Sequence, residues 1–176
     1  IDALGKALSV EYRTIVENGF TLQIDAPDLA MERHTLFADK PLSEFIAFSK
    51  AVIGAINRAV AGLPREKVRL HVCWGNYNGP HDCDEPIENL WPVIEGAHVG
   101  GFVISLANPR HEHELDFFKG ARLPKNATLV AGAIDTTTML KMVGTSRTTT
   151  TVRARARPRP SSNGRYHSRA LRRSLP

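Results

Sequence analysis

The segment KVRLHVC at residues 67–73, with the loop WGNYNGPHDCD at 74–84 behind it, decides the fold class. Residues 67–73 are predicted as a β-strand, and the glycines, proline and asparagines that follow predict a loop. A long amphipathic helix is expected before the strand at 42–61, and a second helix after the loop at 86–96. Strands that alternate with helices in this way are typical of a parallel sheet.

The same alternation runs through the first 143 residues. Further helices are expected at 8–18 and 111–120, and further strands at 20–24, 101–106 and 127–134. Buried strands joined by helices indicate a parallel sheet with right-handed crossovers. Four such strands are half of an eight-stranded barrel, so the chain is predicted to be an α/β protein with a partial TIM (β/α)8 barrel.

The overall composition is that of a globular protein. Of the 176 residues, 42% are hydrophobic and 23% are charged, which is ordinary for a folded domain. No apolar stretch approaches the ~20 residues that cross a bilayer, and the first residues do not have the pattern of a signal peptide. Cys73 and Cys83 can in principle form a disulfide, but in the absence of an export signal we expect reduced thiols and a cytoplasmic protein.

Residues 144–176 differ from the rest of the chain. They contain nine of the 23 basic residues and no Asp, Glu or Lys, so residues 1–143 carry 14 basic and 18 acidic groups, a net charge of −4. This Thr-, Arg-, Pro- and Ser-rich stretch is expected to be a disordered tail behind a barrel domain at 1–143. A basic arm attracts the phosphates of a nucleic acid. We nevertheless favour the alternative that the stretch is a non-native terminus, and we expect no specific nucleic-acid partner.

Polar side chains fall at the ends of the predicted strands, where the chemistry of parallel barrels takes place. They are Asp25, the pair His71 and Cys73, the segment 108–113, and Asp135. Residues two apart on a strand point to the same side, so His71 and Cys73 can bind one metal ion through an imidazole nitrogen and a thiolate. The alternative is that both are buried core residues.

The loop behind the pair offers further side chains. Four of them are potential ligands: His81, Asp82, Cys83 and Asp84. Residues next to Gly and Pro more often serve the geometry of the turn, and this alternative applies above all to Cys83. Trp74 and Asn76 follow the His71–Cys73 pair directly and are expected to line a substrate pocket, although an aromatic ring there can equally close the mouth of the barrel.

The segment ANPRHEH at 107–113 is predicted to bind an anionic group of a substrate. Arg110 can donate paired hydrogen bonds to a carboxylate or sulfonate, with His111 beside it. The alternative is that these residues form the solvated first turn of a helix that begins after Pro109.

Four segments together resemble the methionine synthase II superfamily, the cobalamin-independent methionine synthases, and in particular its short, single-barrel members. They are TLQIDAPDLA (21–30), RLHVCWGNYNGPHDCD (69–84), GGFVISLANPRHEHE (100–114) and LVAGAIDTTT (129–138). The resemblance implies the C-terminal half of a TIM barrel and methyl transfer from 5-methyltetrahydropteroyltriglutamate, a folate carrier, to the thiol of homocysteine. A related branch transfers an alkyl group from an epoxide to the thiol of coenzyme M.

The resemblance also implies roles for single residues. His71 and Cys73 match the family's histidine and first cysteine ligands of zinc, and Asp25 matches the aspartate that receives the amino group of homocysteine. Asp135 is retained at a strand end and is assigned a catalytic role. Zinc lowers the pKa of a bound thiol and holds the thiolate in an open coordination position, which suits a reaction in which sulfur is the nucleophile.

The chain departs from the family pattern in several places. No segment resembles the GTDCGF motif of the last barrel strand, which carries the second cysteine ligand. Ser105, Thr137 and Met31 stand where the classical synthases have a glutamate, a histidine and an acid. An inactive truncated fragment is therefore one alternative, and a metal-free barrel like uroporphyrinogen decarboxylase is another. Because a barrel without its last strand has open sheet edges, we also expect self-association.

Overall fold

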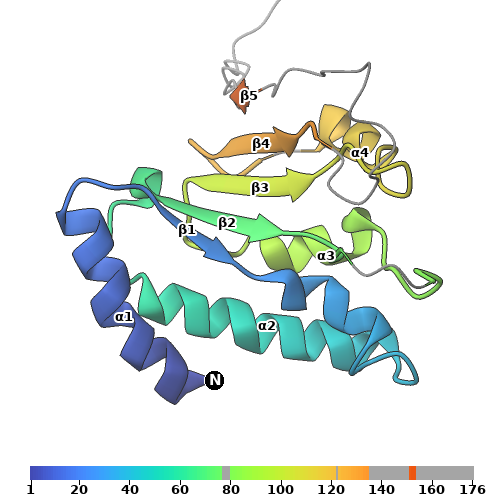
Figure 1. Cartoon of the computed structure of the whole chain (residues 1–176), viewed down its shortest axis with the longest axis horizontal. Coiled ribbons are helices and arrows are strands. Elements are labelled where there is room, and N and C mark those ends of the chain that lie inside the picture. The colour runs from blue at the N-terminus through green and yellow to red at the C-terminus, as the bar shows by residue number, and fades with distance from the viewer. Residues whose placement is uncertain (77–79, 122, 135–150, 154–176) are drawn as a thin grey trace, which may run out of the picture.

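The computed structural model describes residues 1–76, 80–121, 123–134 and 151–153. The chain forms a single sheet whose strands alternate with helices along the sequence (Figure 1). The elements are α1 (Asp2–Glu17), β1 (Leu22–Asp25), the 3-10 turns η1 (Pro27–Leu29) and η2 (Met31–His34), α2 (Leu42–Ala59), η3 (Arg65–Lys67), β2 (Val68–Val72), α3 (Ile87–Ile94), β3 (Gly101–Ser105), α4 (Glu114–Gly120), β4 (Thr128–Gly132) and β5 (Thr151–Arg153).

Strands β1 to β4 are parallel and lie in the order of the sequence. The register pairs Asp25 with His71, and His71 with Val103. Parallel neighbours therefore bring their carboxyl ends to the same edge of the sheet (Figure 1). The predicted α/β class with a parallel sheet is confirmed, and each predicted strand overlaps an observed one.

One face of the sheet is packed against the helices. Alternate strand residues, such as Leu70 and Phe102, point to this side and join one core with the apolar side chains of α2 and α3. Phe45 of α2 and Leu90 of α3 are both buried in that core. Consecutive helices also contact one another, α1 with α2, α2 with α3 and α3 with α4. Because successive side chains of a strand point to opposite sides, the sheet has one face that is covered by helices and a second face.

The second face of the sheet is less covered and more polar. Its residues are exposed or half-buried: Gln23, Asp25, Arg69, His71, Val103, Ser105, Thr128 and Val130. In a strand that is buried on both sides these positions would be apolar. The polar residues that were predicted to carry chemistry on β1 and β2 therefore lie on the face away from the helices.

The ends of two helices differ from the prediction. The first helix begins at Asp2 rather than at residue 8, and α4 begins at Glu114 rather than at residue 111. Residues 108–113 instead form turns, in which the backbone N–H of His111 donates to the carbonyl of Asn108 at 2.9 Å. Among the described residues, no helix is long and apolar enough to cross a membrane.

The predicted tail at 144–176 lies outside the described residues except for β5. Thr151–Arg153 pair with β4 in the antiparallel direction, with Leu129 opposite Val152. These three residues extend the sheet on the β4 side, whereas β1 is the strand at the opposite edge.

Replacing Phe102 by alanine tests the core. Its side chain is 0% exposed and its ring packs edge-on against Trp91 with the ring centroids 5.0 Å apart. Because the substitution leaves a cavity, we expect Phe102→Ala to lower the free energy of unfolding by about 3–5 kcal/mol, measured by urea denaturation. Phe20→Ala is the matched control, because that ring is 66% exposed, and it should cost less than about 0.5 kcal/mol. Equal losses would contradict the assignment of the core.

Candidate functional site

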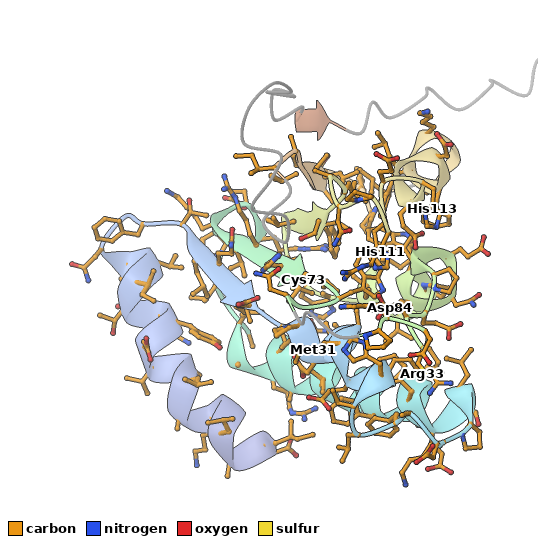
Figure 2. All side chains as sticks on the ribbon, turned by 45° about the vertical axis from the view of Figure 1, so that its right-hand side comes forward. Met31, Arg33, Cys73, Asp84, His111 and His113 are labelled. Atoms are coloured by element: carbon orange, nitrogen blue, oxygen red, sulfur yellow. The ribbon has the colours of Figure 1, made fainter. Side chains whose placement is uncertain are left out.

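Two clusters of polar side chains lie where the strands end. The first consists of Asp25, His71 and Cys73, at the ends of β1 and β2. The second is centred on Asp84 and includes His111 from the loop after β3 (Figure 2). Both clusters use the edge at which the carboxyl ends of parallel strands meet, which is where ligands bind in open and closed α/β sheets.

Asp25 and His71 contact each other across the first pair of strands. They are partners in the register, and Oδ1 of Asp25 lies 2.7 Å from Nδ1 of His71. The side chain of His71 is 23% exposed and that of Asp25 is 68% exposed. When the Nδ1–H of His71 donates to this carboxylate, Nε2 keeps its lone pair, which is the state of a histidine that ligates a metal.

Cys73 joins this cluster from the end of β2. It is a half-buried free thiol, and Cys83 is also free. The hydrogen bond with Cys73 is the largest cause that raises the pKa of His71; burial acts in the opposite direction, and Asp25 adds to the increase. His71 and Cys73 are half-buried while Val72 between them is buried, so the two side chains lie on the same side of the strand, as predicted. That they bind one metal ion stays a prediction.

Asp84 accepts hydrogen bonds from three histidines. Nδ1 of His34 lies 2.7 Å from its Oδ1, and its Oδ2 lies 2.7 Å from Nδ1 of His81 and 2.8 Å from Nε2 of His111. All four side chains are between 4% and 7% exposed. These residues come from η2, from the loop between β2 and α3, and from the loop after β3, so the cluster joins three separate strand-end segments.

The electrostatics of the Asp84 cluster favour a charged carboxylate. Burial on its own would raise the pKa of Asp84, but the hydrogen bonds from His111, His34 and His81 outweigh it and the pKa is lowered. Burial would likewise lower the pKa of His111, whereas Asp84 and Glu114 together raise it. Asp84 and His111 thus stabilise each other's charged forms in a nearly dry environment.

Trp74 and Glu114 fix His111 from two sides. The indole of Trp74 stacks on the imidazole with the ring centroids 3.8 Å apart and the planes 11° apart, and its Nε1–H donates to the carbonyl of Glu85 at 2.9 Å. Oε1 of Glu114 lies 3.7 Å from Nδ1 of His111, which is an electrostatic contact rather than a hydrogen bond. Its Oε2 accepts from the backbone N–H of Ile87 at the start of α3.

Gly75 connects the end of β2 with the segment that carries His34. Its φ is +81°, a conformation that other residues adopt with strain, and a Cβ at this position would lie 2.7 Å from Sδ of Met31. The close approach brings the chain after Trp74 against η2. Leu29 and Ala30, both fully buried, anchor the turns that lead to His34.

The other predicted site residues are placed differently. Asn76 and Arg110 are exposed, and the backbone N–H of Arg110 donates to Oδ1 of Asn108. Trp74, predicted to line a pocket, is only 2% exposed and contributes its ring face to His111. Asp82 is exposed and Cys83 is half-buried. Asp135 and Thr137 lie outside the described residues.

Neither His34 nor Glu114 was predicted as a site residue from the sequence. His34 lies 50 residues before Asp84, and only folding brings the two together. A signal for it existed, because His34 follows the first strand closely and therefore belongs to the same edge as Asp25. Glu114 sits in a helical segment whose charged residues normally face solvent, and nothing in that pattern identifies the one that is buried.

The described residues contain one group of three side chains with the spacing of a metal site, namely His34, His81 and Asp84. Asp25, His71 and Cys73 do not form such a group, although Asp25 and His71 are joined by a hydrogen bond. No protein-family profile matches the chain, and no curated protein or solved structure shows significant similarity to it. The likeness to methionine synthase II therefore stays a prediction from the four quoted segments.

Replacing His111 by glutamine tests the Asp84 cluster through its pH dependence. Since the folded state raises the pKa of His111, its contribution to stability is full below about pH 6.5 and is lost as the pH rises through the folded pKa. The lowered pKa of Asp84 makes its contribution full above about pH 4. We expect His111→Gln to destabilise the chain more at pH 6 than at pH 9, measured by urea denaturation with a chelator present.

His98→Gln is the control for this measurement, because His98 is exposed. Its effect on stability should be small and should change little with pH. A His111→Gln loss that is as large at pH 9 as at pH 6 would contradict the electrostatic role of the ring and leave only its packing on Trp74.

Proposed function

We propose that this chain is a zinc-dependent S-methyltransferase that transfers a methyl group from a folate-like donor to a homocysteine-like thiol. His71 and Cys73 would bind the zinc ion. The observation that carries the proposal is the contact of Asp25, His71 and Cys73 at the carboxyl ends of two adjacent parallel strands. The resemblance of the four quoted segments to the methionine synthase II superfamily gives the reaction type.

The side chains of the cluster fit a zinc ion chemically. An imidazole and a thiolate are both common zinc ligands, and the carboxylate of Asp25 holds the ring of His71 in the manner of a carboxylate–histidine–zinc arrangement. Cys73 is a free, half-buried thiol. Two protein donors leave coordination positions for a substrate thiol, and this supports thiol activation rather than a closed structural site.

Zinc, when bound, would lower the pKa of the substrate thiol so that the thiolate is present at neutral pH. Asp25 has a second role in this proposal. Its Oδ1 is occupied by His71, while the side chain is 68% exposed, so Oδ2 remains accessible to the ammonium group of an amino-acid substrate. The carboxylate thus orients a zinc ligand and recognises the substrate amine.

Arg110 is the proposed partner for the carboxylate of the substrate or for the anionic part of the donor. Its side chain is exposed in the loop after β3, at the same sheet edge as Asp25. Its guanidinium can donate two parallel hydrogen bonds to a carboxylate. Asn76, exposed after β2, is proposed as a second polar contact, and Asp135 as a catalytic acid or base.

Alkyl transfer from an epoxide to coenzyme M is the alternative within the same chemistry. Coenzyme M carries a thiol and a sulfonate but no amine, so it would use zinc and Arg110 and leave Asp25 without a substrate contact. Asp25→Ala should then slow both reactions to the extent that it weakens zinc binding. It should cause a further loss only in the reaction with homocysteine. An inactive fragment is the remaining alternative, and such a chain would alkylate neither thiol.

The fold supports the proposal only at the level of the fold class. Four parallel strands that alternate with helices, with helices packed on one face and polar residues on the other, are compatible with half of a TIM-type barrel. We propose that the described sheet is such a half-barrel. Its polar face would then line the interior and its carboxyl edge the active site.

Titration with Co²⁺ tests the zinc site, because a bound thiolate gives cobalt a sulfur-to-metal charge-transfer band. We expect the wild-type chain to show this band and Cys73→Ser to lose it. Asp25→Ala should weaken the affinity that the band reports by about 10–100-fold, because the carboxylate no longer orients His71. Asp39→Ala is the matched control, an exposed aspartate away from β1, and should leave the affinity unchanged.

The metal-loaded chain should also consume homocysteine thiol in the presence of the methylated folate. A wild-type chain without the sulfur band, or an Asp25→Ala variant with wild-type affinity, would contradict the proposed site. A sulfur-to-cobalt band without alkylation of homocysteine or coenzyme M would support the metal site but contradict the proposed reaction.

Self-association is the proposed behaviour of the isolated chain. Strand β1 lies at an edge of the sheet, and Leu4, Val10 and Phe20 are exposed on α1 and just beyond it. Exposed apolar side chains beside an open strand edge favour association. We expect dimers or larger species in sedimentation velocity at micromolar concentration, and Leu4→Ser with Phe20→Ser should shift them toward the monomer. A monodisperse wild-type monomer would contradict this.

A further inference from the structure

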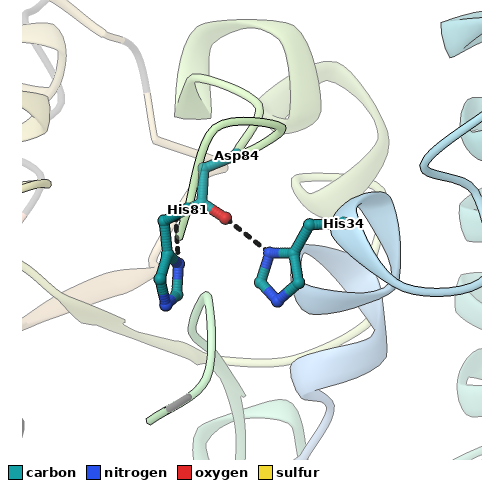
Figure 3. Close-up of side chains that lie close together, drawn as sticks. All are labelled: His34, His81 and Asp84. Carbon is teal, nitrogen blue, oxygen red and sulfur yellow. Dashed lines mark hydrogen bonds and ion pairs between the residues drawn. The ribbon is translucent and has the colours of Figure 1, made fainter. Parts of the chain in front are cut away.

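We propose that His34, His81 and Asp84 form a second metal site, for a divalent first-row transition ion such as zinc. The site shares no residue with the His71–Cys73 pair and goes beyond the methyl-transfer function proposed above. One potential ligand atom from each of the three side chains lies within 4.8 Å of the other two (Figure 3).

The distances are close to those of a metal site. Nδ1 of His34 and Nδ1 of His81 each lie 2.7 Å from an oxygen of Asp84. Bond lengths of ~2.0–2.1 Å in a tetrahedral zinc site place ligand atoms about 3.3 Å apart. On binding an ion, the nitrogens would move slightly away from the Asp84 oxygens, and the three ligand atoms, which lie within 4.8 Å of one another, would close around the metal. Both rings would then carry their proton on Nε2.

Burial and charge also favour a cation here. The side chains of His34, His81 and Asp84 are only 5%, 4% and 7% exposed. Glu114, 5% exposed, lies on the other side of His111 and adds a second buried carboxylate. Asp84 is a buried carboxylate, and a buried charge is costly unless it is compensated. A divalent cation between Asp84 and the two imidazoles would add positive charge next to this carboxylate.

His111 supplies the support that metal-binding carboxylates usually have. Its Nε2 lies 2.8 Å from Oδ2 of Asp84, and its ring is held against Trp74. Such partners orient a ligating carboxylate and are part of the site in most metalloproteins. The three ligands come from two segments: His34 lies in the turn η2, and His81 and Asp84 lie in the loop before α3.

The donor set determines the class of ion. Two imidazoles and one carboxylate suit zinc and its first-row neighbours, whereas calcium and magnesium prefer sites made of oxygen alone. Three protein ligands leave at least one position for water or a substrate group, as in catalytic rather than structural zinc sites. A metal ion bound here would be a second Lewis acid at the carboxyl edge of the sheet, and its binding would not require a cysteine.

Equilibrium dialysis of the full chain against Zn²⁺, followed by metal analysis, tests the second site. We expect about two zinc ions per wild-type chain and about one for His34→Gln and for His81→Gln. Glutamine keeps an amide that can donate to Asp84 but does not bind zinc as imidazole does, so the fold should be retained. The control His98→Gln, at an exposed histidine, should bind as much zinc as the wild type.

Co²⁺ binding to Cys73→Ser gives a measurement that does not disturb the histidine cluster. We expect this variant to keep one cobalt ion, with visible absorption but no sulfur charge-transfer band. Absence of cobalt from Cys73→Ser, or wild-type zinc content in both His34→Gln and His81→Gln, would overturn the second site.

The same spectra separate this inference from the proposed function. A single ion with a sulfur band, unaffected by His34→Gln, overturns the second site and leaves the His71–Cys73 site standing. A single ion without a sulfur band, lost in His34→Gln, supports the second site and removes the zinc-bound Cys73 on which the proposed function rests.

Discussion

Parallel pairing of β1, β2 and β3 is the constraint on which the rest of this structure depends. The pairing sets Asp25 opposite His71 and brings the three following loops to one edge of the sheet. Side chains that are separated by many residues in the sequence meet there because parallel strands share the direction in which they end. Both polar clusters are consequences of that arrangement, the first through the register itself and the second through the loops.

The two clusters differ in their exposure to solvent. Asp25 and His71 lie on the face of the sheet away from the helices, and the side chain of Asp25 is 68% exposed. Asp84 lies behind the loops with three histidines around it, and its charge is stabilised by hydrogen bonds rather than by solvent. An exposed carboxylate suits recognition of a substrate amine, whereas a buried one with several nitrogen neighbours suits a metal ion.

The proposed reaction between a thiol and a methyl donor places two requirements on the protein. The thiol has to be deprotonated, and the donor has to be held while its methyl group leaves. His71 and Cys73 address the first requirement in the proposed function. His111, from the ANPRHEH segment that was predicted to bind an anionic group, is instead buried and hydrogen-bonded to the carboxylate of Asp84, so its ring is not placed to hold an anionic donor.

The sequence by itself determined the order of strands and helices and the pairing of His71 with Cys73, because hydrophobic periodicity and i, i+2 spacing are local properties of the chain. It also indicated His81 and Asp84, which stand in a loop directly behind a strand. Only the tertiary structure decided that Trp74 packs on His111, that Arg110 stays in solvent, and that His34 and Glu114 are buried beside them. These outcomes depend on contacts between segments that are distant in sequence, and such contacts are fixed by how the loops pack once the strands are paired.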